Sequence, residues 1–104
     1  MMKDMGRMLK QLQDAQSRMV KAQEELAART VEGSAGGGMV KAEVNGRNEL
    51  VSLKIDPAVV DPQDVEMLED LIRAAINDAQ SRVQELVRTE MAKVTGGLSI
   101  PGLM

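Results

Sequence analysis

Residues 32–40 read Glu-Gly-Ser-Ala-Gly-Gly-Gly-Met-Val, and they hold four of the nine glycines of this 104-residue chain. A glycine-rich run of this kind can form a phosphate-binding loop, a flexible linker or the bend of a hairpin. A phosphate-binding loop needs a helix directly after the glycines, with a Lys-Ser or Lys-Thr pair at its mouth in the Walker form. Here the glycines lead into Met39-Val40-Lys41, where apolar and polar residues begin to alternate. The stretch therefore predicts a hairpin bend and no nucleotide site.

Strand-like segments lie on both sides of this bend. Residues 30–32 form a short candidate strand before it, and residues 40–44 and 51–55 each alternate between apolar and polar side chains. Asn45-Gly46 lies between the last two segments, and Asn-Gly is a favoured centre of a tight hairpin turn. Asp56-Pro57 ends the third segment, because proline cannot donate to a strand ladder. We expect a three-stranded antiparallel sheet within residues 30–56.

Residues 1–29 are predicted to form one long helix. Its apolar residues recur with alternating spacings of three and four, the heptad seam of helices that pack on one another: Met5, Met8, Leu12, Ala15, Met19, Ala22 and Leu26. Such a helix would be about 40 Å long, more than the roughly 30 Å width of a small domain. Part of it must overhang the domain or lie against a partner. We expect the seam, chiefly Met5, Met8, Leu12, Met19 and Leu26, to serve core packing and the pairing of two copies.

A second helix is predicted over residues 61–95. Asp61-Pro62 combines a helix-capping residue with proline at the first helical position, and Gly96-Gly97 suits a left-handed helix end. Residues 96–104 form an apolar tail that is either frayed or docked. The whole chain, residues 1–104, is thus expected to be a single α+β domain of order α-β-β-β-α, with two long helices and a three-stranded antiparallel sheet.

The composition argues against an enzyme. The chain has no Cys and no His, which excludes thiolate nucleophiles, an imidazole base and the usual zinc sites. Its carboxylates near Asp61 and Asp64 are interpreted as helix caps and a solvated face. We predict no catalytic residue, no metal, no cofactor and no small-molecule substrate. No apolar run reaches the 18 residues that a membrane span needs, so we expect a cytoplasmic protein without membrane contact.

The positive charge of the chain gathers in the first helix. The formal net charge of the whole chain is −3, yet the segment 1–29 carries a basic excess. Four basic residues fall within about 60° of arc opposite the seam, at 100° per residue, with Arg18 beside them: Lys3, Arg7, Lys10 and Lys21. Asp14 interrupts this stripe. It is either a solvated helix face or a surface that meets the phosphates of double-stranded DNA.

Other features bear on the choice of nucleic acid. The chain has no aromatic residue, so bases cannot stack on aromatic rings, and recognition of single strands of that type is disfavoured. Phosphate contacts to duplex DNA remain possible, with weak sequence preference. Basic residues near the end of the second helix are weaker candidates, because they do not share one helical face: Arg82, Arg88 and Lys93.

Several segments together resemble the YbaB/EbfC family of bacterial nucleoid-associated proteins. They lie at residues 5–13, 22–27, 31–41, 45–46, 55–57, 67–79 and 95–102, and the most specific are Glu-Gly-Ser-Ala-Gly-Gly-Gly and Thr-Gly-Gly-Leu-Ser-Ile-Pro-Gly. The resemblance implies a tweezer-like homodimer whose protruding helices reach around double-stranded DNA. It also implies a location at the bacterial nucleoid and no catalysis. The alternative function is a protein-interaction adaptor or chaperone-like factor that uses the Met-rich helical surfaces.

Overall fold

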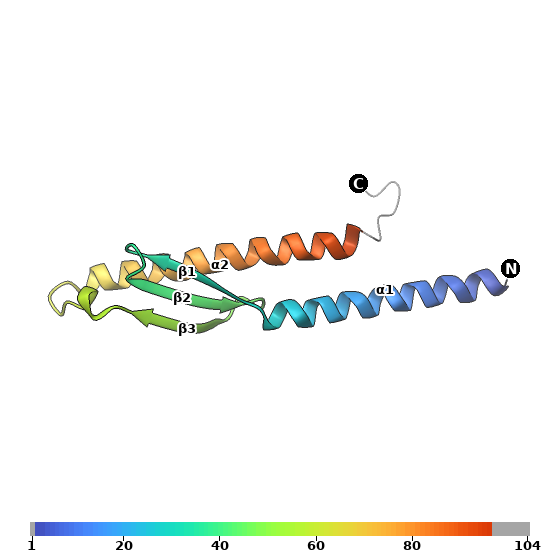
Figure 1. The fold of residues 1–104 in the computed structure, drawn as a ribbon, viewed down its shortest axis with the longest axis horizontal. Helices are drawn as coiled ribbons and strands as arrows, with labels where there is room; N and C mark the ends of the chain where they lie inside the picture. The colour runs from blue at the N-terminus through green and yellow to red at the C-terminus, as the bar shows by residue number, and fades with distance from the viewer. Residues whose placement is uncertain (1, 97–104) are drawn as a thin grey trace.

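A computed structural model describes residues 2–96 of the chain, and the side chains of residues 4–94. The elements follow the order α1 (Met2–Ala28), β1 (Thr30–Ala35), β2 (Val40–Asn45), β3 (Leu50–Ile55), a 3-10 turn η1 (Pro57–Val59) and α2 (Val65–Gly96). The predicted α-β-β-β-α order and the α+β class are confirmed (Figure 1). From Gly97 onward, the predicted apolar tail lies outside the described residues.

The core lies between the sheet and α2. The strands are antiparallel in the order β1-β2-β3, and α2 packs mainly on β1 and β2. Alternate residues of β2 point to α2 because successive side chains of a strand face opposite sides. The buried core consists of Val40, Ala42 and Val44 from β2 and of Ala75, Ala79 and Val83 from α2.

The glycine stretch forms the bend between β1 and β2, as predicted. Gly36, Gly37 and Gly38 have φ angles of 63°, 68° and 92°. Three successive residues in the left-handed region would be strained for any side chain with a Cβ atom, so the bend requires glycine. The Met39 amide donates to the Gly36 carbonyl at 3.4 Å and closes the turn.

Two further glycines allow backbone to approach backbone. A Cβ atom at Gly33 of β1 would lie 2.2 Å from the Ala79 nitrogen of α2. A Cβ atom at Gly46 would lie 1.9 Å from the Leu26 carbonyl oxygen, at the end of α1. The first contact seats α2 directly on β1, and the second brings the β2–β3 loop against the last turn of α1.

The turn predicted at Asn45-Gly46-Arg47-Asn48 is present, since the Asn48 amide donates to the Asn45 carbonyl at 2.9 Å, but its central residues are Gly46 and Arg47 and not Asn45 and Gly46. The left-handed residue of the β2–β3 loop is Asn48, with a φ of 66°. The Asn45 side-chain oxygen accepts hydrogen bonds from the Arg47 and Glu49 amides, at 2.9 and 3.0 Å. An asparagine side chain can imitate a backbone turn in this way. Gly46 therefore serves the approach to α1, and the loop is longer than a two-residue turn.

The start predicted for the second helix, Asp61, is also wrong. Helix α2 begins at Val65, and the Asp64 side chain accepts a hydrogen bond from the Met67 amide at 3.2 Å. The Asp61 side chain accepts from the Gln63 amide at 2.9 Å and forms a separate turn. An Asp-Pro pair suits a turn as well as a helix start. Here Asp64, and not Asp61, caps the helix.

The described chain is strongly elongated. Its extents are 76 × 24 × 16 Å, and its radius of gyration is 20.6 Å. A compact domain of 100 residues has a radius of gyration of about 13 Å. The difference arises because α2 ends beside the middle of α1, and the N-terminal half of α1 continues alone (Figure 1). The overhang predicted from the length of the first helix is present.

The contact at Gly33 generates a first prediction. Gly33→Ala would force α2 away from β1, and we expect the free energy of unfolding to fall by about 1–3 kcal/mol, as for an overpacked core. Gly6→Ala is the matched control, because nothing lies within 4 Å of a Cβ atom there. That change in an exposed helix should stabilise the protein by about 0.5–1 kcal/mol. Urea unfolding followed by circular dichroism, at equal protein concentrations, measures both changes. An unchanged midpoint for Gly33→Ala would contradict the close contact.

Candidate nucleic-acid interface

The basic stripe predicted on the first helix lies on the overhanging and middle parts of α1. We define the basic stripe by its described side chains, Arg7, Lys10, Arg18 and Lys21, all of which are exposed. Lys3 lies in α1, and its side chain is outside the described ones. A helix rotates by 100° per residue, so the stripe points away from the side on which Leu26 is buried.

The basic stripe has no carboxylate partner within the described part of the chain. The ion pairs among side chains 4–94 involve Arg29, Arg73, Arg82, Arg88 and Lys93, and none of the four stripe residues. Asp14 interrupts the stripe in sequence without pairing to it. These four cationic groups can therefore meet an external anion without breaking an ion pair inside the protein.

The three candidates on α2 are placed differently, because each is paired with a carboxylate of its own helix. The Arg82 Nε atom lies 3.2 Å from both carboxylate oxygens of Asp78. Arg88 pairs with Glu85, and Lys93 pairs with Glu90 at 3.3 Å. Their charge is locally balanced. The structure thus separates an unpaired stripe on α1 from paired groups on α2.

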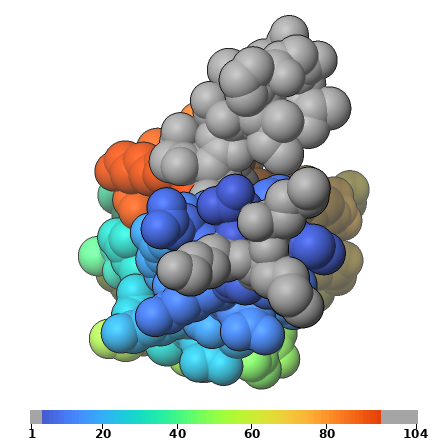
Figure 2. Space-filling view, turned by 90° about the vertical axis from the view of Figure 1, so that its right-hand side faces the viewer, coloured from blue at the N-terminus to red at the C-terminus, as the bar shows by residue number. Residues whose placement is uncertain are grey.

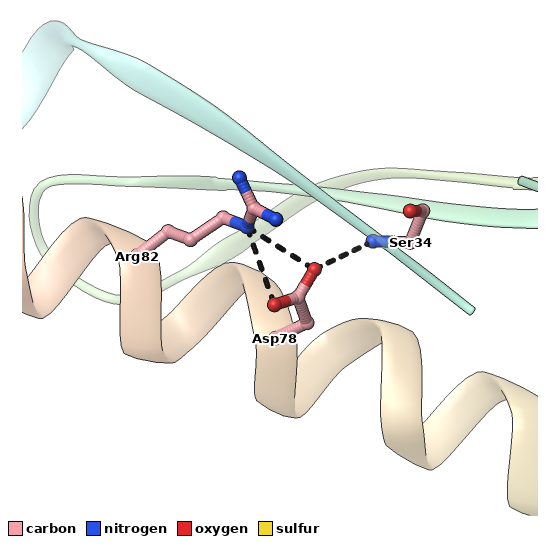
Figure 3. A network of polar contacts seen from close by, with 3 residues as sticks. All are labelled: Ser34, Asp78 and Arg82. Carbon is pink, nitrogen blue, oxygen red and sulfur yellow. Dashed lines mark hydrogen bonds and ion pairs between the residues drawn. The ribbon is translucent and has the colours of Figure 1, made fainter.

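Arg82 belongs to a link between α2 and the sheet (Figure 3). The Ser34 amide of β1 donates at 3.0 Å to the Oδ2 atom of Asp78, which also accepts from Arg82 Nε. The Ser34 amide, and after it the Arg82 guanidinium, holds the pKa of Asp78 below its ordinary value of 3.8. Because β1 is an outer strand of the sheet, this contact covers part of its free edge.

The predicted seam of α1 divides into two parts. Leu26 is buried, and Met19 is half-buried on the same side of the helix. Met5, Met8 and Leu12 are 66%, 62% and 65% exposed. The C-terminal part of the seam (Met19 and Leu26) therefore packs within the chain. The N-terminal part (Met5, Met8 and Leu12) is uncovered in the described residues.

The outer strand β3 also carries uncovered apolar side chains, which were not predicted as a surface from the sequence. Leu50 and Leu53 pair with Val44 and Ala42 of β2, so they share the face on which α2 lies. They are nevertheless 47% and 38% exposed, because α2 covers β1 and β2. We call Leu50 and Leu53 the β3 face.

Helix α2 presents an apolar flank on the side of the molecule where β3 lies. Asp78 marks the flank of α2 that meets the β1 edge, and Ile76 lies on the opposite flank. An open hollow of about 360 Å³ adjoins Ile72 and Ile76 there. The hollow therefore faces the side of the molecule on which β3 lies. The alternation of the strands could be seen in the sequence. The sequence did not reveal that α2 would pack on β1 and β2 and leave this side uncovered.

Two lysines of the sheet were also missed. Lys41 and Lys54 stand directly opposite each other in the β2–β3 ladder, and both are exposed. They lie on the face away from α2, because their neighbours Val40 and Ala42 point to the core. Like charges placed opposite each other are unfavourable. The two lysines form a second cationic site. It could have been found from the sequence by aligning the two strands of the predicted hairpin residue by residue.

Neither a metal site nor a membrane-spanning helix is found in the described residues. Within them, no group of three or more acidic side chains could hold a metal ion. Neither of the two long helices, as far as residues 2–96 describe them, is apolar enough over a sufficient length to cross a bilayer. The candidate functional features are surfaces: the basic stripe, the exposed N-terminal part of the seam (Met5, Met8 and Leu12) and the β3 face.

Comparison with known proteins fits this arrangement. A model of the YbaB/EbfC DNA-binding family matches residues 2–98. The chain belongs to this family. The description of the family names DNA binding and no enzymatic activity.

Individual relatives extend the match. A nucleoid-associated protein of Moorella thermoacetica is 58% identical over 101 residues, covering 97% of both chains. One from Thermoanaerobacter sp. strain X514 is 57% identical over 100 residues, covering 96% of this chain and 90% of its own. Among solved structures, the uncharacterized protein HP0035 of Helicobacter pylori has a TM-score of 0.71 and 26% identity, over 90% of this chain and 96% of its own.

The Asp78 link generates a prediction about pH. The folded-state pKa of Asp78 lies below its ordinary value of 3.8, so the carboxylate stabilises the fold above that pH and ceases to do so as the pH falls through the folded-state pKa. Asp78→Asn should therefore have a lower Tm than the unchanged protein at neutral pH, and the gap should narrow in acid. Asp70→Asn is the control, because Asp70 pairs only with Arg73 on the same helix. A gap that stays constant into acid would show that the charge of the Asp78 carboxylate does not contribute to stability, and equal Tm values at neutral pH would show that the link itself does not.

Proposed function

We propose that the protein is a nucleoid-associated homodimer that contacts double-stranded DNA mainly through its phosphates. The observation that carries this proposal is the exposed basic stripe, whose four side chains have no carboxylate partner in the described chain. The names of the relatives and the DNA-binding description of the family support it. Neither the names of the relatives nor the description of the family favours the alternative, a protein-interaction adaptor.

The dimensions of the basic stripe suit a DNA backbone. From Arg7 to Lys21, α1 rises by about 21 Å at 1.5 Å per residue. This length corresponds to about six base pairs at 3.4 Å along each strand. Lysine and arginine can meet phosphates whatever the base, so we expect weak sequence preference. The N-terminal part of α1 projects away from the bulk of the fold (Figure 1), and Arg7 and Lys10 of this part are exposed.

Two copies are needed to make this contact effective, because one stripe offers few charges and the chain as a whole is acidic. We propose that the copies pair through the β3 face. The edge of β3 is open, whereas the β1 edge meets Asp78. Joining β3 to its counterpart would cover Leu50 and Leu53 and would bring the Ile76 flanks of the two α2 helices toward each other. The overhanging helices would remain free to contact DNA.

A charge reversal tests the DNA surface. We expect Lys10→Glu to weaken duplex binding equally for unrelated sequences. It should also reduce the slope of log affinity against log salt by about one unit for each phosphate that Lys10 neutralises, hence by about two for a dimer. Arg73→Glu is the matched control, since Arg73 lies near the start of α2 and is paired with Asp70. Titrations by fluorescence anisotropy at several salt concentrations measure both variants. Equal effects of the two changes would reject the stripe.

A second substitution tests the pairing surface. Leu53→Asp would place a charge in the proposed contact, and an unpaired buried charge costs several kcal/mol. We expect a folded protein of monomer mass by light scattering, because Leu53 lies at the edge of the core. Val60→Asp is the control at a similarly exposed apolar side chain outside the β3 face, and it should remain a dimer. A folded Leu53→Asp dimer would contradict this interface.

A further inference from the structure

The face of the sheet away from α2 is not covered by a helix in the described part of the chain. Helix α2 packs on the other face, against β1 and β2. One row of the open face consists of Ser34, Lys41 and Lys54, which stand opposite one another on β1, β2 and β3. Gly33 meets α2, so the next side chain along β1, that of Ser34, points away from the helix (Figure 3). We call these three residues the sheet row.

The two ammonium groups of the sheet row are not neutralised within the described residues. Neither lysine takes part in an ion pair among side chains 4–94. Carboxylates do lie on this face, since Glu32 and Glu43 form the next row. The Lys41 side chain leans the other way, because a Cβ atom at Gly38 of the bend would lie 3.8 Å from its Cε atom. The sheet row thus offers two cationic groups and a hydroxyl to an external anion.

The sheet row lies on the same side of the molecule as part of the basic stripe. Helix α2 is the common reference, because it packs on the sheet and then runs beside α1 (Figures 1 and 2). Leu26 of α1 is buried on the side of α2, where it lines one cavity with Val87. At 100° per residue, Lys10 and Lys21 point about 160° and 140° away from Leu26. These two lysines and the sheet row therefore all face away from α2.

We propose that the sheet row is a second phosphate-contact site for double-stranded DNA, and that one duplex runs along the side away from α2, from the basic stripe to the sheet. This inference rests on the proposed function and adds a site and a path to it. Ammonium and hydroxyl groups bind phosphate oxygens whatever the base. Neighbouring strands are about 4.8 Å apart, so the row crosses about 10 Å of the sheet. That width allows contacts to more than one phosphate of a DNA strand.

The two sites are far enough apart to be separated by duplex length. About 27 Å of α1 lie between Lys10 and the helix end at Ala28, and about 13 Å of β2 lie between Asn45 and Lys41. The strands and α1 extend along the same long axis (Figure 1), so the sites are about 40 Å apart. This distance corresponds to about twelve base pairs at 3.4 Å each. A shorter duplex cannot contact both sites.

Fluorescence-anisotropy titrations of Lys41→Gln combined with Lys54→Gln test the proposal on duplexes of roughly 24 and roughly ten base pairs, longer and shorter than the separation of the sites. On the longer duplex, the slope of log affinity against log salt should fall by about two units for each bound copy. On the shorter duplex, the variant and the unchanged protein should bind alike. Arg73→Gln combined with Arg88→Gln is the matched control, because each arginine is paired with a carboxylate of α2, and it should leave the slope unchanged.

The sheet variant is expected to fold as the unchanged protein does. Its two lysines are exposed and stand opposite each other, and like charges in that position are unfavourable. Circular dichroism should therefore show a Tm that is equal or higher. Each single change, Lys41→Gln or Lys54→Gln, should lower the slope by about half as much, which provides the same test with a smaller change to the protein.

Two results would overturn the proposal. One is an unchanged slope for the sheet variant on the longer duplex. The other is an equal loss on both duplexes, because the sheet row would then act without a duplex that spans the two sites. If Lys10→Glu weakens binding and the sheet variant does not, this inference fails alone and the proposed function stands. If the unchanged protein binds neither duplex, the proposed function fails and this inference fails with it.

Discussion

The close approach of α2 to β1 at Gly33 is the contact on which the rest of the structure depends. With no Cβ atom at this position, the Ala75 and Ala79 turn of α2 lies directly on the strand. The side chains that fill the core are then small or β-branched, which suits a chain without any aromatic residue. The same placement commits α2 to the β1 side of the sheet. Strand β3 is left uncovered as a consequence, and with it the apolar side chains Leu50 and Leu53, which we propose as the pairing surface.

The two ends of α1 serve different purposes. Its last turn is held by Gly46 of the β2–β3 loop and by the burial of Leu26, so the direction of the helix is set by the body of the protein. Its N-terminal half projects beyond α2 and carries Arg7 and Lys10 of the basic stripe on one side and the exposed Met5, Met8 and Leu12 on the other. A rigid projection of this kind places charge at a distance from the acidic remainder of the chain. This arrangement answers the objection that the net charge of −3 disfavours a DNA-binding protein.

Much of the fold could be predicted from local patterns. The glycines at 36–38 and the alternation around Val40 depend on short-range geometry, and the bend and the strand predicted from them are confirmed. Of the seam of the first helix, Leu26 is buried and Met19 is half-buried, whereas its part in pairing two copies stays a prediction. The centre of the turn at residues 45–48 was misplaced by one residue and the start of the second helix by four, because asparagine and aspartate side chains can cap several competing backbone conformations. The β3 face could not be foreseen, because the strand pattern does not reveal which strands a helix will cover. The bond from the Ser34 amide to Asp78 was likewise hidden until α2 was positioned, whereas the Arg82–Asp78 pair has the i,i+4 spacing that the predicted helix already implied.

The central claim is that a dimer grips the phosphates of a DNA duplex through unpaired charges on α1. The most direct measurement is a titration of the unchanged protein with unrelated duplexes at several salt concentrations, run beside light scattering. The account predicts dimer mass, similar affinity for every sequence, and a log affinity that falls linearly with log salt by several units per decade. A monomer that leaves duplex DNA unbound even in dilute buffer would contradict it.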